Sequence, residues 1–456
     1  MLCALNDLLH ASHPVPLPPA QDMRAALNTA LLGLEEEKDL VISTLYASGR
    51  KMLFFCGAPG TGKTALARAL AKASGRTLVR VDMAALLPDT LTGQASVHGV
   101  GGNAGILVQR IARAGKPCVV LLDEIDKTTE AVANRLLELF ENDRVFDDAF
   151  VGRVDLKEHL FLLSGNSLHI TRPLLDRCQV VQMQPYTPGE KAALLQLKWN
   201  AALCEEKLPC QPLDKELVRQ VVARCASGGV RDIENAAERM VRLVAAGHPL
   251  PQTAEAVHRL LGGGLPAPQP IRNPGTVYCL AALENGGGLV SPLQVAENPN
   301  GARLQTLGMV DSATMRESCE MTLAVAARIL NCSPPALLVA MDASRKDGPS
   351  GGAAIFLAVY SLMTGTVLKG VAATGELMLD GSILPVGGVP SKLIGAVRCA
   401  GLVRTVLLPA ANRADVPEKL SEEAAAAGIA LHYVANVQEA IALLPHERAV
   451  QTQQPL

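Results

Sequence analysis

The segment RKDGPSGGAA, residues 345–354, carries Gly348, Ser350 and Gly352 in a G-x-S-x-G spacing that can present a serine nucleophile. A serine hydroxyl attacks poorly until a neighbouring base takes its proton. A strand-to-helix elbow with this spacing places the serine directly after a strand and needs a histidine downstream. Here the expected strand ends well before the serine, and His432 alternates with apolar residues in an expected core strand. The elbow is therefore a weak interpretation.

A lysine is the other candidate for the base. A neutral amine accepts a proton when burial or a nearby positive field lowers its pKa. The stretch LPVGGVPSKLIGAVRCAG, residues 384–401, predicts a helix with Pro390 at its start and Gly401 at its stop. Lys392 then lies in the first turn, where the helix dipole and apolar neighbours disfavour an ammonium group. The alternatives are that Ser350 only caps a helix and that the lysine reaches solvent.

A second group of residues has the spacing of a phosphate-binding loop. The segment GAPGTGKT follows an expected strand, opens an expected helix and matches G-x-x-x-x-G-K-[ST]. Its backbone N–H groups can surround phosphates at the positive end of the helix. Lys63 would reach the β and γ oxygens, and the Thr64 hydroxyl would bind Mg²⁺. The residues predicted to bind ATP here are Gly57, Gly60, Thr61, Gly62, Lys63 and Thr64.

A carboxylate pair completes this predicted ATP site. The hydrophobic run CVVLLDE, residues 118–124, ends in Asp123 and Glu124. Asp123 could hold Mg²⁺ through water, and Glu124 could polarise the attacking water. The alternative is that Asp123 and Glu124 only form a solvated strand end. The phosphate-binding loop about sixty residues earlier favours the functional interpretation over this alternative.

Composition limits the classes of protein. About half of the 456 residues are apolar and 19% are charged, which supports packed cores, and the net charge of −2 gives no general attraction to nucleic acid or anionic lipid. DNA binding is thus possible but not indicated. The 11 cysteines include no C-x-x-C, which indicates free thiols in a reducing compartment. The start shows no signal peptide, and the uncharged stretch 348–368 favours a buried helix over a membrane span. A cytoplasmic location is expected.

The first half of the chain resembles the AAA+ ATPases. The segment GLEEEKDLVISTL, residues 33–45, is similar to their lead helix. The resemblance implies that Asn166 is a polar sensor, that Arg177 is an arginine finger and that Arg231 is a second sensor on a helical lid. A finger stabilises charge on the γ-phosphate and often comes from a neighbouring subunit. The alternative for both arginines is an ordinary surface position.

The second half resembles the Lon protease family. KDGPSGG and TGELMLDGSILPVGGVPSKL are similar to its serine and lysine segments, and the resemblance covers about residues 29–446. It implies Ser350 as nucleophile, Lys392 as general base and Thr374 as a hydroxyl near the lysine. Backbone N–H groups around Ser350 and Gly351 could stabilise the oxyanion. It further implies an ATP-dependent serine endopeptidase that acts on unfolded or misfolded polypeptides as a homohexamer.

Three features depart from the Lon pattern. No substrate-gathering domain precedes the ATPase, so a short form is expected. The segment that matches the pore loop, residues 95–105, has no aromatic residue. The candidates to press on a substrate are Val97, His98 and Val100, with Phe150 on a second loop. The pair Pro390-Ser391 replaces a polar pair before the lysine, and the doublet Gly351-Gly352 stands where alanine is common.

The predicted fold class is α/β: an AAA+ parallel-sheet ATPase core with a small helical lid, followed by a mixed α+β Lon-type protease domain. The expected divisions are a proline-rich lead-in 1–28, the ATPase core 29–187, the lid 188–262, a Gly/Pro linker 263–275, the protease domain 276–446 and a tail 447–456. Two other functions stay open: a remodelling ATPase with a weakly active or ATP-independent peptidase domain, and a DNA-transaction ATPase with a Lon-like domain.

Overall fold

The computed structural model describes residues 16–444, except 48–51, 85, 96–101, 142–144, 263–267, 300, 302, 308–312, 332–334 and 342–348. Contacts within the chain divide it into two units, Met1–Gln184 and Pro185–Leu456. The division falls close to the expected end of the ATPase core. The helices expected to form the lid belong to the second unit, together with the expected protease domain.

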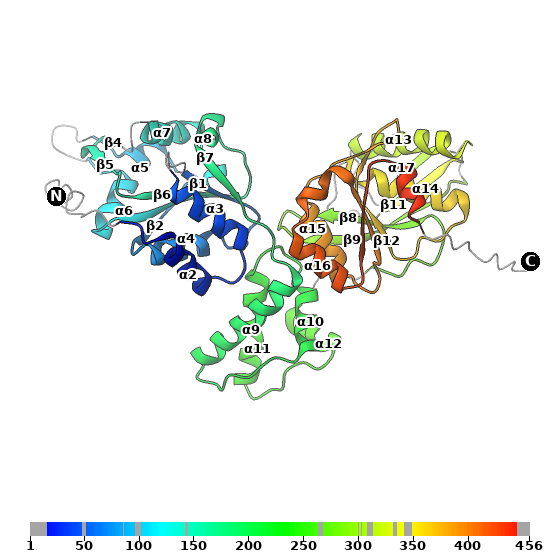
Figure 1. Cartoon of the computed structure of the whole chain (residues 1–456), viewed down its shortest axis with the longest axis horizontal. Helices are drawn as coiled ribbons and strands as arrows, with labels where there is room; N and C mark the ends of the chain where they lie inside the picture. Colours follow the sequence, from blue (N-terminus) through cyan, green and yellow to red (C-terminus); the bar gives the residue numbers. More distant parts are fainter. Residues whose placement is uncertain are drawn as a thin grey trace, which may run out of the picture. The chain divides into compact units, whose positions relative to one another are not determined.

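A parallel sheet of five strands forms the centre of the first unit, in the order β2-β3-β6-β1-β7 (Figure 1). Every residue of three of these strands is buried, as expected for strands covered by helices on both faces. This confirms the predicted parallel α/β core. The strands are β1 (Met52–Cys56), β2 (Thr77–Asp82), β3 (Cys118–Asp123), β6 (Leu160–Gly165) and β7 (Cys178–Gln182).

The helices of this unit follow the strands in alternation. The chain moves from β1 to β2 in one direction across the sheet and from β2 to β3 in the other, so right-handed connections place the helices on opposite faces. The helices are α2 (Ala20–Ala30), α3 (Glu35–Tyr46), α4 (Lys63–Ala73), α5 (Pro88–Thr92), α6 (Ile106–Ala114), α7 (Glu130–Glu141) and α8 (Arg172–Asp176), with a 3₁₀ turn η1 (Ile125–Lys127). Helix α3 matches the predicted lead helix. Helix α2 begins inside the expected lead-in 1–28, and its Met23 and Leu27 are fully buried.

A short antiparallel hairpin, β4 (Val145–Asp148) with β5 (Gly152–Asp155), was not expected from the sequence. Phe150 lies in its turn and is half-buried. The buried Asp148 carboxylate shapes that turn, because it accepts hydrogen bonds from the N–H groups of Phe150 and Gly105, at 2.9 and 2.7 Å. The other suggested substrate-gripping residues, Val97, His98 and Val100, lie outside the described residues.

Four helices open the second unit, as the helix-patterned stretch 188–262 predicted. They are α9 (Pro188–Glu205), α10 (Lys215–Arg224), α11 (Arg231–Ala245) and α12 (Ala254–Leu261). Side chains cap three of their starts: Thr187 forms a reciprocal capping box with Glu190, and Asp214 and Thr253 cap α10 and α12. The fully buried Trp199 anchors their core, and its indole N–H donates to the Gln211 carbonyl at 2.8 Å.

A mixed sheet of seven strands follows in the same unit, in the order β10-β11-β9-β8-β12-β15-β16. A short antiparallel hairpin that turns near Asp380-Gly381 forms beside it. The sheet strands are β8 (Thr276–Ala282), β9 (Gly288–Glu297), β10 (Leu304–Leu307), β11 (Leu337–Met341), β12 (Val371–Ala373), β15 (Thr405–Pro409) and β16 (Ala430–Val434), and the hairpin pairs β13 (Glu376–Leu377) with β14 (Ile383–Leu384).

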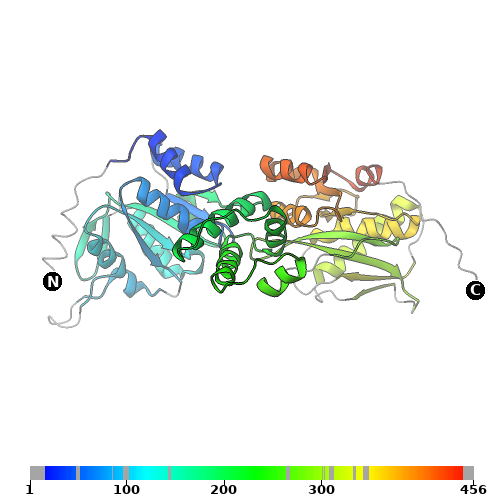
Figure 2. The same cartoon turned by 90° about the horizontal axis from the view of Figure 1, so that it is seen from below.

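The two faces of this sheet carry different helices (Figure 2). Strand β8 shows the alternation: Val277 and Cys279 join the core under one set of helices, and Tyr278 and Leu280 join the core under the other. The first face holds α13 (Ala313–Leu330), α14 (Gly352–Thr364) and α17 (Val437–Ala442). The second face holds α15 (Val389–Arg398) and α16 (Glu418–Ala426).

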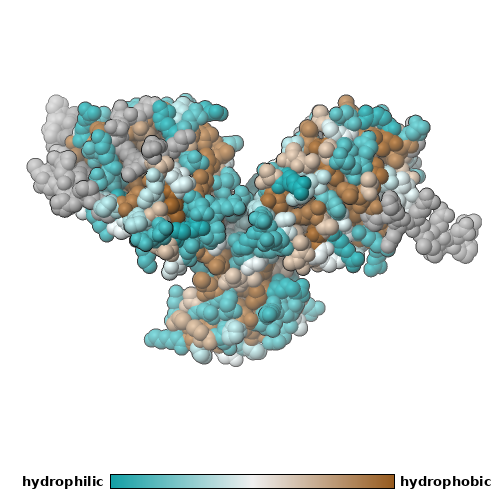
Figure 3. All heavy atoms as spheres, viewed as in Figure 1, coloured by the Kyte–Doolittle hydropathy of each residue, from teal (hydrophilic) through white to brown (hydrophobic). Residues whose placement is uncertain are grey.

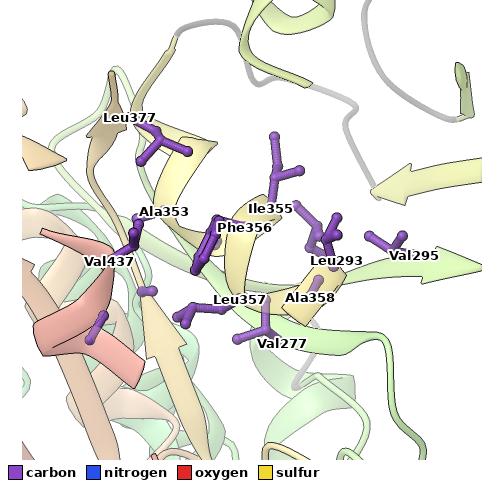
Figure 4. Close-up of a cluster of buried hydrophobic side chains, with 14 of the residues drawn as sticks. Val277, Leu293, Val295, Ala353, Ile355, Phe356, Leu357, Ala358, Leu377 and Val437 are labelled. Atoms are coloured by element: carbon purple, nitrogen blue, oxygen red, sulfur yellow. The ribbon is translucent and has the colours of Figure 1, made fainter. Parts of the chain in front are cut away.

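Helix α14 is the apolar centre of the first face. Figure 4 shows its residues Ile355, Phe356 and Leu357 among side chains from the neighbouring strands, including Val277 and Leu293. Nearly the whole helix is buried against protein. The uncharged stretch around it is therefore a core helix, as predicted. Across the described part of the chain, no helix is both long and apolar enough to cross a membrane. Hydrophobic residues are interspersed among hydrophilic ones on the face seen in Figure 3.

Candidate nucleotide and protease sites

The phosphate-binding loop joins the carboxyl end of β1 to the amino end of α4. Gly60 and Gly62 have φ of 82° and 97°, a left-handed region in which a side chain is strained. A Cβ on Gly57 would lie 2.5 Å from the Met183 carbonyl oxygen. Glycine is therefore required at these positions to turn the chain, and Lys63 begins the helix that follows.

Lys63 meets the predicted sensor Asn166 at this loop. Its Nζ donates hydrogen bonds to the carbonyls of Gly57 and Ala58, at 2.5 and 3.0 Å, and to Asn166 Oδ1 at 3.0 Å. The ammonium group thus lies over the loop that would hold phosphates. Asn166 lies on the segment that follows β6, so the structure brings together two residues separated by more than a hundred positions.

Asp123 lies at the carboxyl end of β3, and both of its carboxylate oxygens accept hydrogen bonds. Oδ2 accepts from Arg80 Nε at 2.7 Å, and Oδ1 accepts from the Ser164 hydroxyl and from the Glu124 N–H. Arg80 and Ser164 were not predicted to belong to the site. Their signal in the sequence is slight, because both lie within ordinary-looking strands, and only the sheet register places them beside Asp123.

Glu124 and Asp126 follow in the next turn. Glu124 has a left-handed φ of 58°, which directs its side chain away from the strand, and its carboxylate pairs with Lys127 at 2.9 Å. The Asp126 carboxylate accepts the N–H groups of Asn166 and Ser167, at 2.9 and 3.1 Å. Asp126 therefore fixes the sensor segment, a role that the sequence did not indicate.

These residues fit ATP with Mg²⁺. A helix amino end, glycine N–H groups and a lysine suit phosphate oxygens. The Thr64 hydroxyl and the Asp123 carboxylate are oxygen ligands of the kind Mg²⁺ prefers. Arg177 follows α8 in the same unit and donates to the Pro173 carbonyl at 3.0 Å. Arg231 is the exposed first residue of α11, in the second unit.

Ser350 and Lys392 lie at the starts of two helices, α14 and α15, that cover opposite faces of the seven-stranded sheet. Ser350 lies in the 3₁₀ turn η2 (Pro349–Gly351), which leads into α14, and is half-buried. Lys392 lies in the first turn of α15, which has proline near its start as predicted, and is 3% exposed. The segments of Ser350 and Lys392 both approach the carboxyl end of β12. Thr374 directly follows this strand and lies between them.

Thr374 connects the two segments. Lys392 Nζ donates to Thr374 Oγ1 at 3.0 Å, and that hydroxyl donates to the Ser350 carbonyl at 3.1 Å. The Gly375 N–H donates to the same carbonyl at 2.8 Å. Thr374 is 1% exposed, so these hydrogen bonds are shielded from water. The geometry agrees with the expected place of this hydroxyl near the lysine.

Burial lowers the pKa of Lys392 from 10.5 to about 8, and the Cys279 thiol acts weakly in the opposite direction. The same turn of the helix is closed to water, since Val389, Leu393 and Ile394 are all at most 1% exposed. An amine with this pKa is partly neutral near physiological pH and can accept a proton from a hydroxyl.

The start of α14 offers donors for a negatively charged oxygen. Gly351 and Gly352 lie in its first turn, where backbone N–H groups have no partner within the helix. A Cβ on Gly352 would lie 2.9 Å from the Leu377 nitrogen, so glycine is required there. The nearest atom to a Cβ on Gly351 would be Cys279 Sγ, at 3.9 Å. This turn suits the oxyanion of an acyl-transfer reaction.

Comparisons with known proteins match two separate parts of the chain. The family "Lon protease (S16) C-terminal proteolytic domain" matches residues 267–445. The "ATPase family associated with various cellular activities (AAA)" matches residues 53–186. The AAA match contains the phosphate-binding loop, Asp123 and Arg177, and the Lon match contains Ser350 and Lys392, whereas Arg231 lies in neither. The chain therefore combines a domain similar to AAA ATPases with a Lon-type (S16) proteolytic domain.

Curated Lon proteases match over most of this chain. One from Phenylobacterium zucineum (strain HLK1) is 32% identical over 452 residues, which cover 89% of this chain and 56% of the relative. One from Erwinia amylovora and one from Escherichia coli (strain K12) are each 30% identical, and each alignment covers 93% of this chain and 58% of the relative. The chain therefore spans a little over half the length of these Lon proteases.

Proposed function

We propose that this chain is an ATP-dependent serine endopeptidase of the Lon type. The observation that carries the proposal is the buried Lys392, whose pKa lies near 8 and which shares Thr374 with the segment of Ser350. Ser350 Oγ would attack a peptide carbonyl while Lys392 takes its proton and then gives it to the leaving amine. Water would cleave the acyl-enzyme by the same route in reverse.

The proposed nucleotide is ATP, bound together with Mg²⁺. Lys63 would bind the phosphates, and Thr64 and Asp123 would hold the metal, which supplies charge neutralisation during phosphoryl transfer. Glu124 would orient the attacking water once it leaves Lys127, and Asn166 would sense the γ-phosphate. Arg231 would contact the nucleotide from the lid, and Arg177 would act on the site of the next subunit.

The proposed substrates are unfolded or misfolded polypeptides, and the proposed assembly is a homohexamer in the cytoplasm. A finger that acts between subunits requires a head-to-tail ring, which supports the assembly. The domain limits proposed are those expected from the sequence: an ATPase core to residue 187, a lid to 262, a linker to 275 and a protease domain to 446.

A degradation assay on an unfolded protein, with and without Mg-ATP, tests this function. Ser350→Ala and Lys392→Ala should abolish cleavage of both protein and short peptides, because each removes a reacting group. Glu124→Gln should abolish ATP hydrolysis and protein degradation while short-peptide cleavage persists. Cleavage by Ser350→Ala at the wild-type rate would reject the nucleophile. Wild-type ATP hydrolysis with no proteolysis under any condition would favour a remodelling ATPase.

A further inference from the structure

The helix that carries Lys392 is fastened to the helical lid by one arginine. Arg398, the last residue of α15, donates from Nε to the Ala223 carbonyl of α10 at 3.1 Å. It also donates from Nη1 to the Gly288 carbonyl, at the start of β9, at 3.0 Å. Burial lowers the pKa of this guanidinium. The residue is half-buried, and the two carbonyls replace part of the water around its guanidinium.

The turn between β8 and β9 lies between the lid and α15. On the lid side, the Gly228 N–H donates to the Asn285 carbonyl at 2.8 Å. On the other side, the buried Ser391 hydroxyl donates to the Gly286 carbonyl at 2.9 Å. Ser391 directly precedes Lys392. The turn thus bonds at once to the lid and to the residue next to the proposed base.

The backbones in this junction are too close together for side chains. A Cβ on Gly228 would lie 2.5 Å from the Gly286 carbonyl oxygen, and one on Gly287 would overlap the Ala226 carbonyl. On the side of α15, a Cβ on Gly395 would lie 2.7 Å from the Gly288 carbonyl carbon. Close-packed segments of this kind transmit displacement instead of absorbing it.

The lid end of the junction leads to the proposed second sensor. Gly228 lies three residues before Arg231, which begins α11. The fully buried Lys191 of α9 braces the same loop, because its Nζ donates to the carbonyls of Cys225, at 2.9 Å, and Ser227. A displacement of the start of α11 would therefore be passed to the turn after β8 through the loop 225–228. Lys191 holds this loop on one side, and the turn after β8 holds it on the other.

We propose that Arg398 is a positioning residue for the serine–lysine pair. It holds α15 against the lid and the β8–β9 turn, which keeps Lys392 in line with Thr374. A nucleotide-dependent movement of the lid at Arg231 then changes the alignment of Lys392. The proposal rests on the proteolytic function given above, and it assigns Arg398 no contact with substrate.

Cleavage of a short fluorogenic peptide tests the role in the full-length chain, with and without Mg-ATP. Arg398→Met should lower kcat about tenfold or more, leave KM within about twofold and abolish the response to ATP, because the base loses its alignment and substrate binding does not change. Arg398→Lys should recover part of both, because an ammonium group can reach one of the two carbonyls. Arg404→Met removes an exposed arginine of the same domain and should match wild type. Wild-type kcat and ATP response in Arg398→Met would overturn the proposal.

Hydrogen exchange of the α15 backbone, followed by mass spectrometry, tests the link without relying on proteolysis. Exchange over residues 389–398 should differ between ADP and a slowly hydrolysed ATP analogue in wild type and in Arg404→Met, but not in Arg398→Met. An equal nucleotide effect in Arg398→Met, or none in wild type, would overturn the link. A wild type that shows the exchange difference but cleaves no peptide would reject the proposed function alone. If Arg398→Met fails to fold, Ser391→Ala is judged by the same criteria, and Arg398→Lys by a partial loss of the nucleotide effect.

Discussion

At the scale of single residues, the proposed chemistry depends on an amine kept away from water. Lys392 is 3% exposed, and its hydrogen bond to Thr374 orients it without neutralising it with a carboxylate. Desolvation is therefore the main cause of its low pKa, near 8. In the proposed nucleotide site, the Asp123 carboxylate instead accepts hydrogen bonds from Arg80 and from the Glu124 N–H.

The lowered pKa predicts the pH dependence of peptide cleavage. Only the neutral amine can take the serine proton, so kcat/KM for a short peptide should rise with pH, pass its midpoint near 8 and level off above about 9. Initial rates from pH 6 to 10 in buffers of constant ionic strength measure the profile. A rate that continues to climb toward pH 10.5 would show that Lys392 keeps the pKa of an exposed lysine.

At the scale of elements, the site is where three segments converge at the carboxyl end of β12. Helices α14 and α15 cover opposite faces of the sheet, and Thr374 leaves the strand between them. The tight contact between α14 and β13 at Gly352 sets how closely the serine turn approaches this point.

Substitution by alanine should have different effects at the two neighbouring glycines Gly351 and Gly352. Gly352→Ala places a methyl group 2.9 Å from the Leu377 nitrogen and should destabilise the protein by about 1–3 kcal/mol and reduce peptide cleavage. Gly351→Ala meets only Cys279 Sγ at 3.9 Å and should fold and cleave like wild type. Denaturant unfolding and peptide kinetics measure both. Equal behaviour of the two variants would contradict the packing described.

Much of this arrangement is readable from the sequence, and the rest depends on long-range contacts. The strands, the phosphate-binding loop and the helix start that buries Lys392 follow from local patterns of apolar, glycine and proline residues. Arg80, Ser164 and Asp126 could not be found in that way, because their partners lie some forty positions distant and meet only through sheet register. Arg398 was missed for the same reason, since its acceptor Ala223 belongs to a different layer.

At the scale of the whole molecule, the residues predicted to bind nucleotide are divided between the two units of the chain. The phosphate-binding loop, Asp123 and Arg177 belong to the first unit, and Arg231 belongs to the second with the serine–lysine pair. The lid helices pack with the protease sheet through polar contacts: Glu423 of α16 accepts from the Thr187 hydroxyl and the Gly189 N–H, and Lys419 pairs with Glu190.

Mixing two inactive variants tests the proposed ring. Lys63→Ala lacks phosphate binding but keeps its finger, and Arg177→Ala keeps the phosphate loop but lacks the finger. If Arg177 acts on a neighbouring subunit, an equal mixture should recover about a quarter of wild-type ATP hydrolysis, since about one interface in four combines both intact halves. The rate is measured by phosphate release after subunit exchange. No recovery in mixed rings of confirmed composition would place the finger within its own subunit or remove its role.

The membership of the lid in the second unit has a practical meaning for protein engineering. A chimaera that exchanges peptidases between relatives by cutting at the Gly/Pro stretch after Leu261 would separate Arg398 from Ala223 and Glu423 from Thr187. A cut after Gln184 would transplant the four lid helices and the peptidase as one cassette, with their shared contacts intact. Chimaeras joined after Gln184 should give hybrid enzymes in which ATP hydrolysis by the recipient's ATPase core still controls the donor's peptidase.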